Sequence, residues 1–291
     1  MKDEEKKRIR HSSIKPRSGS PRAKKSFGQN FLVDASVIEK IVRALNPRHG
    51  ETIIEIGPGR GALTGRLIET ASRLVAIEFD RDLLPGLREQ FGTAKNLELI
   101  EDDALQVDLC SAITPAGSAR LVANLPYYIS TAILQRLLAQ RACLTELVLM
   151  LQREVAERIS AAQSTSSRGY LSVLVEAYAE VEKLFDVAPT AFRPVPKVWS
   201  TVVRVKIRPT PAIDVPNEPL LWLLVSAGFA QKRKTIFNNL RSVQGGFLNE
   251  SMTRAGGAGE LLELTGIDAG RRAEDLALDE WAMLARAIEP A

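Results

Sequence analysis

The segment Asn124-Leu125-Pro126-Tyr127 carries groups suited to chemistry on a nucleic-acid base. An exocyclic adenine amine is a poor nucleophile because its lone pair is delocalised into the ring. Hydrogen-bond acceptors aimed at its two N–H groups favour a tetrahedral, nucleophilic nitrogen. The Asn124 amide oxygen and a neighbouring backbone carbonyl, in a turn stiffened by Pro126, are such acceptors, and Tyr127 can stack on a flipped base. We predict that this segment activates an adenine amine; the alternative is a plain turn after a strand.

A second segment, residues 53–61 with the sequence IIEIGPGRG, is an apolar strand that leads into a glycine loop. Glycines let the backbone turn sharply and approach a ligand at the carboxyl end of a parallel strand. The spacing of Gly57, Gly59 and Gly61 differs from the G-x-G-x-x-G fingerprint of NAD-binding proteins. Together with the adenine-activating segment, it favours S-adenosylmethionine over NAD as the cofactor.

Carboxylates follow the next two predicted strands. Glu78 ends the strand after the glycine loop, where a carboxylate accepts hydrogen bonds from both ribose hydroxyls of a nucleoside. Asp102 and Asp103 end the third strand, where the carboxylate of one of them can accept a hydrogen bond from the amino group of an adenine. The alternative for these two residues is an ordinary acidic surface loop.

The composition excludes several classes of protein. Cys110 and Cys143 are too few for a disulfide framework, and with His11 and His49 they are badly spaced for zinc, so we expect reduced cysteines and no metal. Hydrolases that use a Ser-His or Cys-His pair are disfavoured for the same reason. The sequence has no apolar run of about 18 residues and no secretory signal, which predicts a cytoplasmic protein without a membrane span.

Positive charge is concentrated in three places. Residues 1–25 hold ten Lys and Arg against three acids, and the segments 187–213 and 219–249 contain no acid. Clustered positive charge indicates a polyanion partner, the alternative being solvated faces. The predicted RNA contacts are Lys197, Lys232, Arg233, Lys234 and Arg241. We interpret residues 1–25 as a disordered basic arm, because the early acids disfavour a transit peptide.

Strands and helices alternate from Phe27 onward, which predicts a doubly wound α/β sheet. The predicted strands are Thr52–Gly57, Leu74–Phe79, Leu97–Glu101, Leu121–Asn124, Leu147–Leu151 and Val202–Ile207, with helices at 61–70, 82–91 and 130–140. After a proline-rich linker, helices are predicted at 220–230, 232–243, 258–264 and 272–288. The expected domains are therefore a methyltransferase domain at 26–210 and an all-helical, RNA-binding domain at 215–291.

Phe192 is a second candidate for base stacking. It lies in a proline-rich loop within a basic segment, and aromatic stacking is worth about 1–3 kcal/mol per base. The alternative is a hydrophobic plug over the edge of the sheet.

The motifs together resemble a known family, the small-subunit (16S) rRNA adenine N6,N6-dimethyltransferases. The resemblance covers roughly residues 25–290 and rests on segments 27–32, 53–61, 124–127, 151–158, 192–197 and 231–240, in that order. It implies dimethylation of two adjacent adenosines in the 3′-terminal hairpin loop of 16S rRNA, within a 30S particle, by a monomeric enzyme. It also implies roles in cofactor binding: Asn30 and Leu32 cover the cofactor, Gly57 contacts it, Glu78 binds the ribose, Asp103 binds the adenine, and Asn124 joins both sites.

Two other functions stay open at this point. The 23S rRNA adenine methyltransferases of macrolide resistance share the fold and the stacking motif, although Leu125 and the segment 234–240 favour the small-subunit enzymes. A non-catalytic ribosome assembly factor can keep such a site by descent. Trp199 departs from the family pattern, which has a small or acidic residue at this position.

Overall fold

The computed structural model describes residues 23–24 and 28–289, so most of the predicted basic arm, residues 1–25, lies outside the described part. The described chain forms two compact units. The first contains the chain up to Arg153 together with Lys183–Val205, and the second contains Glu154–Glu182 together with the chain from Lys206 onward. The chain therefore passes between the units three times, whereas the sequence predicted a single change of domain between 210 and 215.

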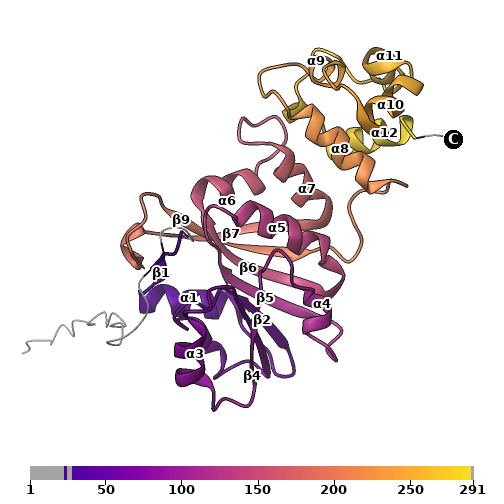
Figure 1. Ribbon diagram of the computed structural model, residues 1–291. Helices are drawn as coiled ribbons and strands as arrows, with labels where there is room; N and C mark the ends of the chain where they lie inside the picture. The colour runs from indigo at the N-terminus through magenta and orange to yellow at the C-terminus, as the bar shows by residue number, and fades with distance from the viewer. Residues whose placement is uncertain (1–22, 25–27, 290–291) are drawn as a thin grey trace, which may run out of the picture. The chain divides into compact units, whose positions relative to one another are not determined.

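A mixed sheet of seven strands, in the order β4-β3-β2-β5-β6-β9-β7, forms the centre of the fold (Figure 1). All six predicted strands are present: β2 (Thr52–Ile56), β3 (Arg73–Glu78), β4 (Leu97–Glu101), β5 (Ala119–Asn124), β6 (Leu144–Gln152) and β9 (Ser200–Ile207). The pairs β3/β4, β2/β3, β2/β5 and β5/β6 are parallel. The predicted α/β sheet is thus confirmed.

The seventh strand, β7 (Ala179–Val187), was not predicted. It lies at the edge of the sheet, and its sequence AEVEKLFDV places charged residues at exposed positions. Charged side chains are common on edge strands because they discourage pairing with another chain. They also weaken the apolar pattern by which a strand is found in a sequence.

Both faces of the sheet are buried. One face packs against α1 (Ala35–Leu45) and α2 (Thr64–Leu67) in a core that includes Ile53, Val122 and Val148. The other face is formed by fully buried residues that include Ile54, Val75, Leu121 and Leu149. The helix predicted at 61–70 is reduced to α2, because Gly61 has φ +78° and no right-handed helix contains this conformation. The other helices of this region are α3 (Leu84–Phe91), α4 (Leu109–Ala112) and α5 (Ser130–Ala139).

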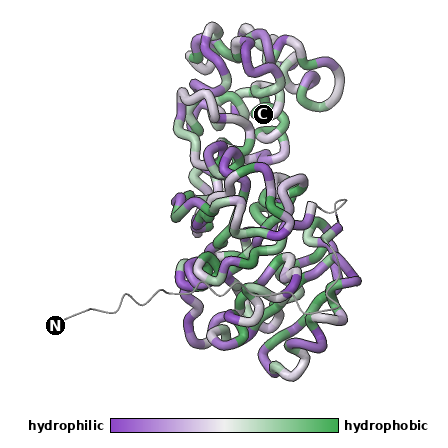
Figure 2. The backbone as a smooth tube through the Cα atoms, turned by 90° about the vertical axis from the view of Figure 1, so that its left-hand side faces the viewer, coloured by the Kyte–Doolittle hydropathy of each residue, from purple (hydrophilic) through white to green (hydrophobic). Residues whose placement is uncertain are grey.

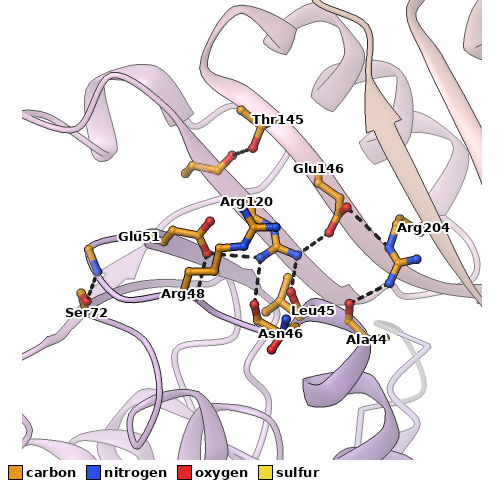
Figure 3. Close-up of polar contacts among 12 residues, drawn as sticks. Ala44, Leu45, Asn46, Arg48, Glu51, Ser72, Arg120, Thr145, Glu146 and Arg204 are labelled. Atoms are coloured by element: carbon orange, nitrogen blue, oxygen red, sulfur yellow. Dashed lines mark hydrogen bonds and ion pairs between the residues drawn. The ribbon is translucent and has the colours of Figure 1, made fainter.

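A network of charges ties the amino ends of β2, β5 and β6, and the middle of β9, to the end of α1 (Figure 3). Arg120 on β5 pairs with Glu51 at 3.2 Å and with Glu146 on β6, and it also donates to the carbonyls of Leu45 and Asn46. Arg204 on β9 pairs with the same Glu146 at 3.5 Å and donates to the Ala44 carbonyl at 2.9 Å. Every charged group in this network therefore has a partner of opposite sign.

The expectation of two reduced cysteines is wrong. Cys110 on α4 and Cys143 on the short helix η2 (Arg141–Cys143) form a disulfide, with their Cα atoms 5.5 Å apart. The two segments are held side by side by Gln140, whose side chain bonds the Leu109 N–H and the Val107 carbonyl. The cysteines are 33 positions apart in the sequence, so only the folded chain reveals that they are neighbours.

The second unit is largely helical. Its helices are α6 (Arg153–Ile159), α7 (Tyr170–Tyr178), α8 (Glu218–Gly228), α9 (Ile236–Arg241), α10 (Gly246–Arg254), α11 (Gly257–Leu264) and α12 (Leu278–Ala287), and only Arg153, the first residue of α6, belongs to the first unit. Its chain alternates between hydrophobic and hydrophilic residues, as expected of helices with one buried side (Figure 2). Trp281 is fully buried, and Gly228 makes room for it, since a Cβ there would lie 2.4 Å from the indole. The sequence did not predict α6, α7 or α10. No helix in the described ranges is long and apolar enough to cross a membrane.

Candidate active site

A cavity of about 340 Å³ opens at the carboxyl ends of the central strands, in the first unit. Its walls come from the loops after β2, β3, β4 and β5 and from the segment before β1 (Phe31–Leu32). Most of the predicted site residues line it: Asn30, Gly57, Gly59, Glu78, Asp103, Asn124, Pro126 and Tyr127. The topology brings these residues together because parallel strands end at the same edge of a sheet.

The glycine loop forms part of the wall of the cavity. Gly59 has φ +60°, and a Cβ on it would lie 3.2 Å from the Phe31 ring. A Cβ on Gly61 would lie 2.3 Å from the Phe91 ring, so a larger residue there would displace the ring. Glycine is therefore required both for the backbone conformation and for the close packing of the loop.

Glu78 is held in place by the backbone. One carboxylate oxygen accepts the Gly59 N–H and the other accepts the Asp80 N–H, both at 2.9 Å. Its side chain is buried, and this burial raises the pKa of Glu78 above its ordinary value despite the two hydrogen bonds. Each oxygen has a lone pair left, so the carboxylate can accept two further hydroxyl donors.

A second carboxyl group, Glu55, lies in the strand below the loop and was missed by the sequence interpretation. It is 1% exposed, does not line the cavity, and accepts the Thr64 hydroxyl at 2.7 Å. Burial raises the pKa of Glu55 to about 7, and the nearby charge of Glu78 contributes in the same direction. A glutamate inside an apolar strand gives no sign in the sequence that its side chain is buried against Thr64 at the start of α2.

A polar clasp of Lys24, Gln29 and Asp80 closes one side of the cavity, and none of the three was predicted. Lys24 and Gln29 donate to the two Asp80 oxygens at 2.6 and 2.7 Å, and Lys24 also pairs with Asp82 at 2.7 Å. Burial raises the pKa of Asp80, but the hydrogen bonds from Lys24 and Gln29 outweigh it and hold the pKa below its usual value. The clasp fixes Gln29, the residue before Asn30, against the end of β3.

The adenine-activating segment is oriented by its neighbours. The Asn124 amide nitrogen donates to the Asn30 carbonyl at 3.3 Å, which leaves the amide oxygen to accept from a ligand. The Tyr127 hydroxyl hydrogen-bonds the Ser200 hydroxyl at 2.7 Å. Burial raises the pKa of Tyr127 above its ordinary value, although the bond to Ser200 acts in the opposite direction. The phenol is therefore neutral at physiological pH and is not a general base.

Leu32 and Phe192 do not line the cavity. Both belong to the hydrophobic core, where Phe192 is fully buried and pairs with Leu32 across the small antiparallel sheet of β1 and β8 (Phe192–Arg193). A side chain without exposed surface cannot stack on a base in this conformation. The structure thus argues against the predicted stacking role of Phe192 and favours the alternative of a hydrophobic plug. Leu32 can reach a cofactor only through its backbone.

The predicted RNA contacts lie on the surface of both units. Lys197, Lys232, Arg233, Lys234 and Arg241 are all exposed. Lys232 donates to the Ser166 carbonyl, and the Arg241 guanidinium lies over the Phe237 ring at 5.0 Å. The predicted helix at 232–243 begins only at Ile236 as α9 (Ile236–Arg241), so Lys232, Arg233 and Lys234 lie in the turn before it. The helix buries Ile236 and Leu240 and exposes Arg241. A role of these residues in RNA binding stays a prediction.

Comparison with known proteins decides the family. The sequence model of the family described as ribosomal RNA adenine dimethylase matches residues 21–284. The chain belongs to this family. It is an rRNA adenine dimethyltransferase that uses S-adenosylmethionine, and its substrate is rRNA.

Relatives within the family span almost the whole chain. The proteins called ribosomal RNA small subunit methyltransferase A from Pelotomaculum thermopropionicum and Acidobacterium capsulatum are each 42% identical to it. The alignments cover 91% of this chain and 90% of the first relative, and 93% of this chain and of the second.

Solved structures show that the dimethyltransferase has a Rossmann-like methyltransferase fold. A dimethyladenosine transferase from Plasmodium falciparum superposes with a TM-score of 0.68 at 24% identity, over 87% of this chain and 95% of that chain. The 23S rRNA methyltransferase ErmE superposes with a TM-score of 0.63, also at 24% identity, over 89% of this chain and 99% of that one. These likenesses concern the fold and do not distinguish between rRNA targets.

Proposed function

We propose that the enzyme dimethylates N6 of two adjacent adenosines in the 3′-terminal hairpin loop of 16S rRNA. The proposed substrate is a 30S particle late in assembly, in the cytoplasm, and the enzyme acts as a monomer without a metal ion. The names of the relatives at 42% identity support the small subunit as the target. The observation that carries the proposed chemistry is the orientation of Asn124, whose amide nitrogen is occupied by Asn30 while its oxygen is available.

The cavity fits a nucleoside cofactor. Glu78 offers two oxygens to the ribose hydroxyls, and Asp103, oriented by the Leu105 N–H at 2.9 Å, offers a carboxylate to the adenine amine. Phe79, which is 56% exposed and lines the cavity, provides an apolar surface for the adenine ring. When bound, S-adenosylmethionine supplies a methyl group on a sulfonium centre. These residues hold and orient the donor, and Gly57 lets the backbone approach it.

Activation of the target adenine needs two acceptors at one place. The Asn124 amide oxygen is the first. The carbonyl of Pro126 accepts the Ile129 N–H at 3.3 Å, and the carbonyl of Tyr127 accepts the Ser130 hydroxyl at 3.2 Å. We therefore assign the second acceptor to the Leu125 carbonyl. Two acceptors on the amine draw its lone pair out of the ring and position it for in-line transfer, and the proton leaves afterwards to solvent.

Two competing functions make different predictions. A 23S rRNA enzyme of the macrolide-resistance type would methylate 23S rRNA instead, and the shared fold with ErmE at 24% identity gives that alternative no weight. A non-catalytic assembly factor would bind the particle without transferring a methyl group. The set formed by Gly57, Glu78, Asp103 and Asn124 around one cavity supports an active enzyme.

Mass spectrometry of rRNA fragments tests the proposal. Purified enzyme, S-adenosylmethionine and unmodified ribosomal subunits are incubated, and the rRNA fragments are then analysed. We expect two dimethyladenosines in the 3′-terminal fragment of 16S rRNA and none in the parallel 23S sample. Methylation of 23S rRNA alone, or of neither RNA, would refute the proposed target.

A further inference from the structure

Trp199 is an exposed aromatic residue close to the active site but outside its cavity. Phe79, Tyr128 and Trp199 are 56%, 60% and 45% exposed, and the first two line the cavity. Trp199 does not. An exposed indole forgoes the free energy that its burial would contribute. A smaller or polar residue would suit this surface as well, so we looked for a role of the ring.

The indole is held in one position by the start of α6. The Arg153 guanidinium lies over the ring at 4.9 Å from its centroid, and the Arg153 N–H donates to the Trp199 carbonyl at 3.0 Å. Arg153 is itself fixed by Asp186 at 2.8 Å, and Asp186 accepts the Thr201 hydroxyl at 2.6 Å. A ring braced in this way loses little conformational entropy when a ligand stacks on it.

A short hydrogen-bonded path connects Trp199 to the base-binding tyrosine. Ser200, the next residue, is fully buried and bonds the Tyr127 hydroxyl at 2.7 Å. The same loop exposes the cations Arg193 and Lys197. The indole is therefore one residue away from a contact with the adenine-activating segment, and its loop carries charge that suits a phosphate backbone.

We propose that Trp199 is a stacking platform for an unpaired nucleotide next to the target adenosine. This inference rests on the proposed function, in which the target lies in a hairpin loop whose neighbouring bases are unpaired. Arg153 supports the indole, the exposed part of the ring receives the base, and Lys197 meets the adjoining phosphate. Aromatic stacking tolerates any base, so the platform contributes affinity and position with little choice of sequence.

Kinetics on unmodified 30S particles distinguish a tryptophan that stacks on the RNA from one that only stabilises the fold. For Trp199→Ala we expect the KM for particles to rise roughly tenfold with kcat within about twofold of wild type, as for the loss of one stacked base. Trp199→Phe, which keeps an aromatic ring, should recover most of the loss. Val198→Ala is the matched control, since Val198 is an exposed apolar neighbour without a ring, and it should leave KM unchanged.

Tryptophan fluorescence reports the stacking directly. The chain has three tryptophans, and Trp281 is fully buried. A single-stranded RNA with the sequence of the 16S hairpin loop should quench the emission of the wild type, and Trp199→Phe should abolish most of that quenching while still binding the RNA. An unchanged KM in Trp199→Ala together with equal quenching in both proteins would overturn the platform. A lower melting temperature and a lower kcat with an unchanged KM would also overturn it, since this pattern identifies a residue that only stabilises the fold.

The two proposals fail in different ways. If the wild type methylates 23S rRNA and the Trp199 variants lose affinity for that RNA, the assignment of the target is wrong and the platform holds. If the wild type methylates the 16S hairpin and Trp199→Ala does so with the same KM, the platform is wrong and the target holds.

Discussion

The two ends of the central sheet treat charged and polar groups differently. At the amino ends of the strands, Arg120 is shared between Glu51 and Glu146, and Arg204 completes the network. At the carboxyl ends, Glu78 is held by two backbone N–H groups and keeps acceptor capacity that the protein does not use. Charged groups that neutralise each other stabilise the fold, whereas an oriented carboxylate with unused hydrogen-bond acceptors is available to a ligand. The residues that stabilise the sheet and the residues that bind the ligand thus lie at opposite ends of the strands.

The largest expected effect is that of Asn124→Ala at the carboxyl ends. Removal of a preorganised hydrogen-bonding group at a reacting centre costs about 10²–10³-fold in kcat, so we expect methyl transfer to be abolished within the limits of a standard assay. Binding to 30S particles should stay close to that of the wild type. Incorporation of labelled methyl groups and particle pull-down measure the two quantities. Full activity in this variant would refute the acceptor role.

At the opposite end, Arg120→Met should lower stability without lowering kcat. The variant leaves Glu51 and Glu146 without their main partner in a half-buried site, which costs about 3 kcal/mol. Denaturant unfolding measures the loss, and methyl transfer at 25 °C measures activity in the folded protein. A large drop in kcat at full stability would show that the two ends of the sheet are not independent.

Glu55, on the strand that leads into the glycine loop, should make the stability of the protein depend on pH. Its pKa of about 7 in the fold exceeds the ordinary value of 4.5, so the folded protein binds a proton that the unfolded chain releases between these values. The stability contribution is fully present below pH 4.5 and is lost as pH rises through 7. Each pKa unit corresponds to about 1.4 kcal/mol, so the loss reaches about 3 kcal/mol at high pH.

Glu55→Gln, which cannot ionise, should therefore be more stable than the wild type at pH 8.5 and nearly equal to it at pH 4. Thermal melting across this range measures the difference. Parallel melting curves of the two proteins at all pH values would exclude a proton on Glu55. Thr64→Val is a control, because it removes the hydroxyl that bonds this carboxyl and leaves the carboxyl itself in place.

Much of the site was predictable because its residues follow apolar strands. Glu78, Asp103 and Asn124 each stand where a run of apolar residues ends, and the parallel topology then brings the strand ends to one edge. The clasp was not predictable, since Lys24 and Asp80 are neighbours only in the folded chain. The burial of Phe192 was not predictable either: a proline-rich loop indicated exposure, but the residue pairs with Leu32 and its ring is buried in the core.

The smallest expected effect concerns that clasp. Lys24→Met removes the cation from Asp80 and keeps an aliphatic side chain, so Asp80 should hold Gln29, the neighbour of Asn30, less firmly. Solvent-exposed ion pairs contribute little to stability, and we expect a two- to fivefold weaker affinity for S-adenosylmethionine with little change in melting temperature. Arg66→Met, which breaks an exposed ion pair to Glu39 away from the cavity, is the matched control. Equal affinities in both variants would show that the clasp does not support cofactor binding.

The most direct test of the separation between the two ends is the affinity for S-adenosylmethionine of two matched variants, measured by isothermal titration calorimetry. In Glu78→Gln an amide nitrogen must face a backbone N–H from Gly59 or Asp80, and the ribose loses a charged acceptor. We predict at least roughly tenfold weaker binding for this variant, since hydrogen bonds to charged groups are worth about 1.5–3 kcal/mol. For Glu146→Gln we predict wild-type affinity in a less stable protein. Wild-type affinity in Glu78→Gln, or an equal loss in both variants, would contradict the account.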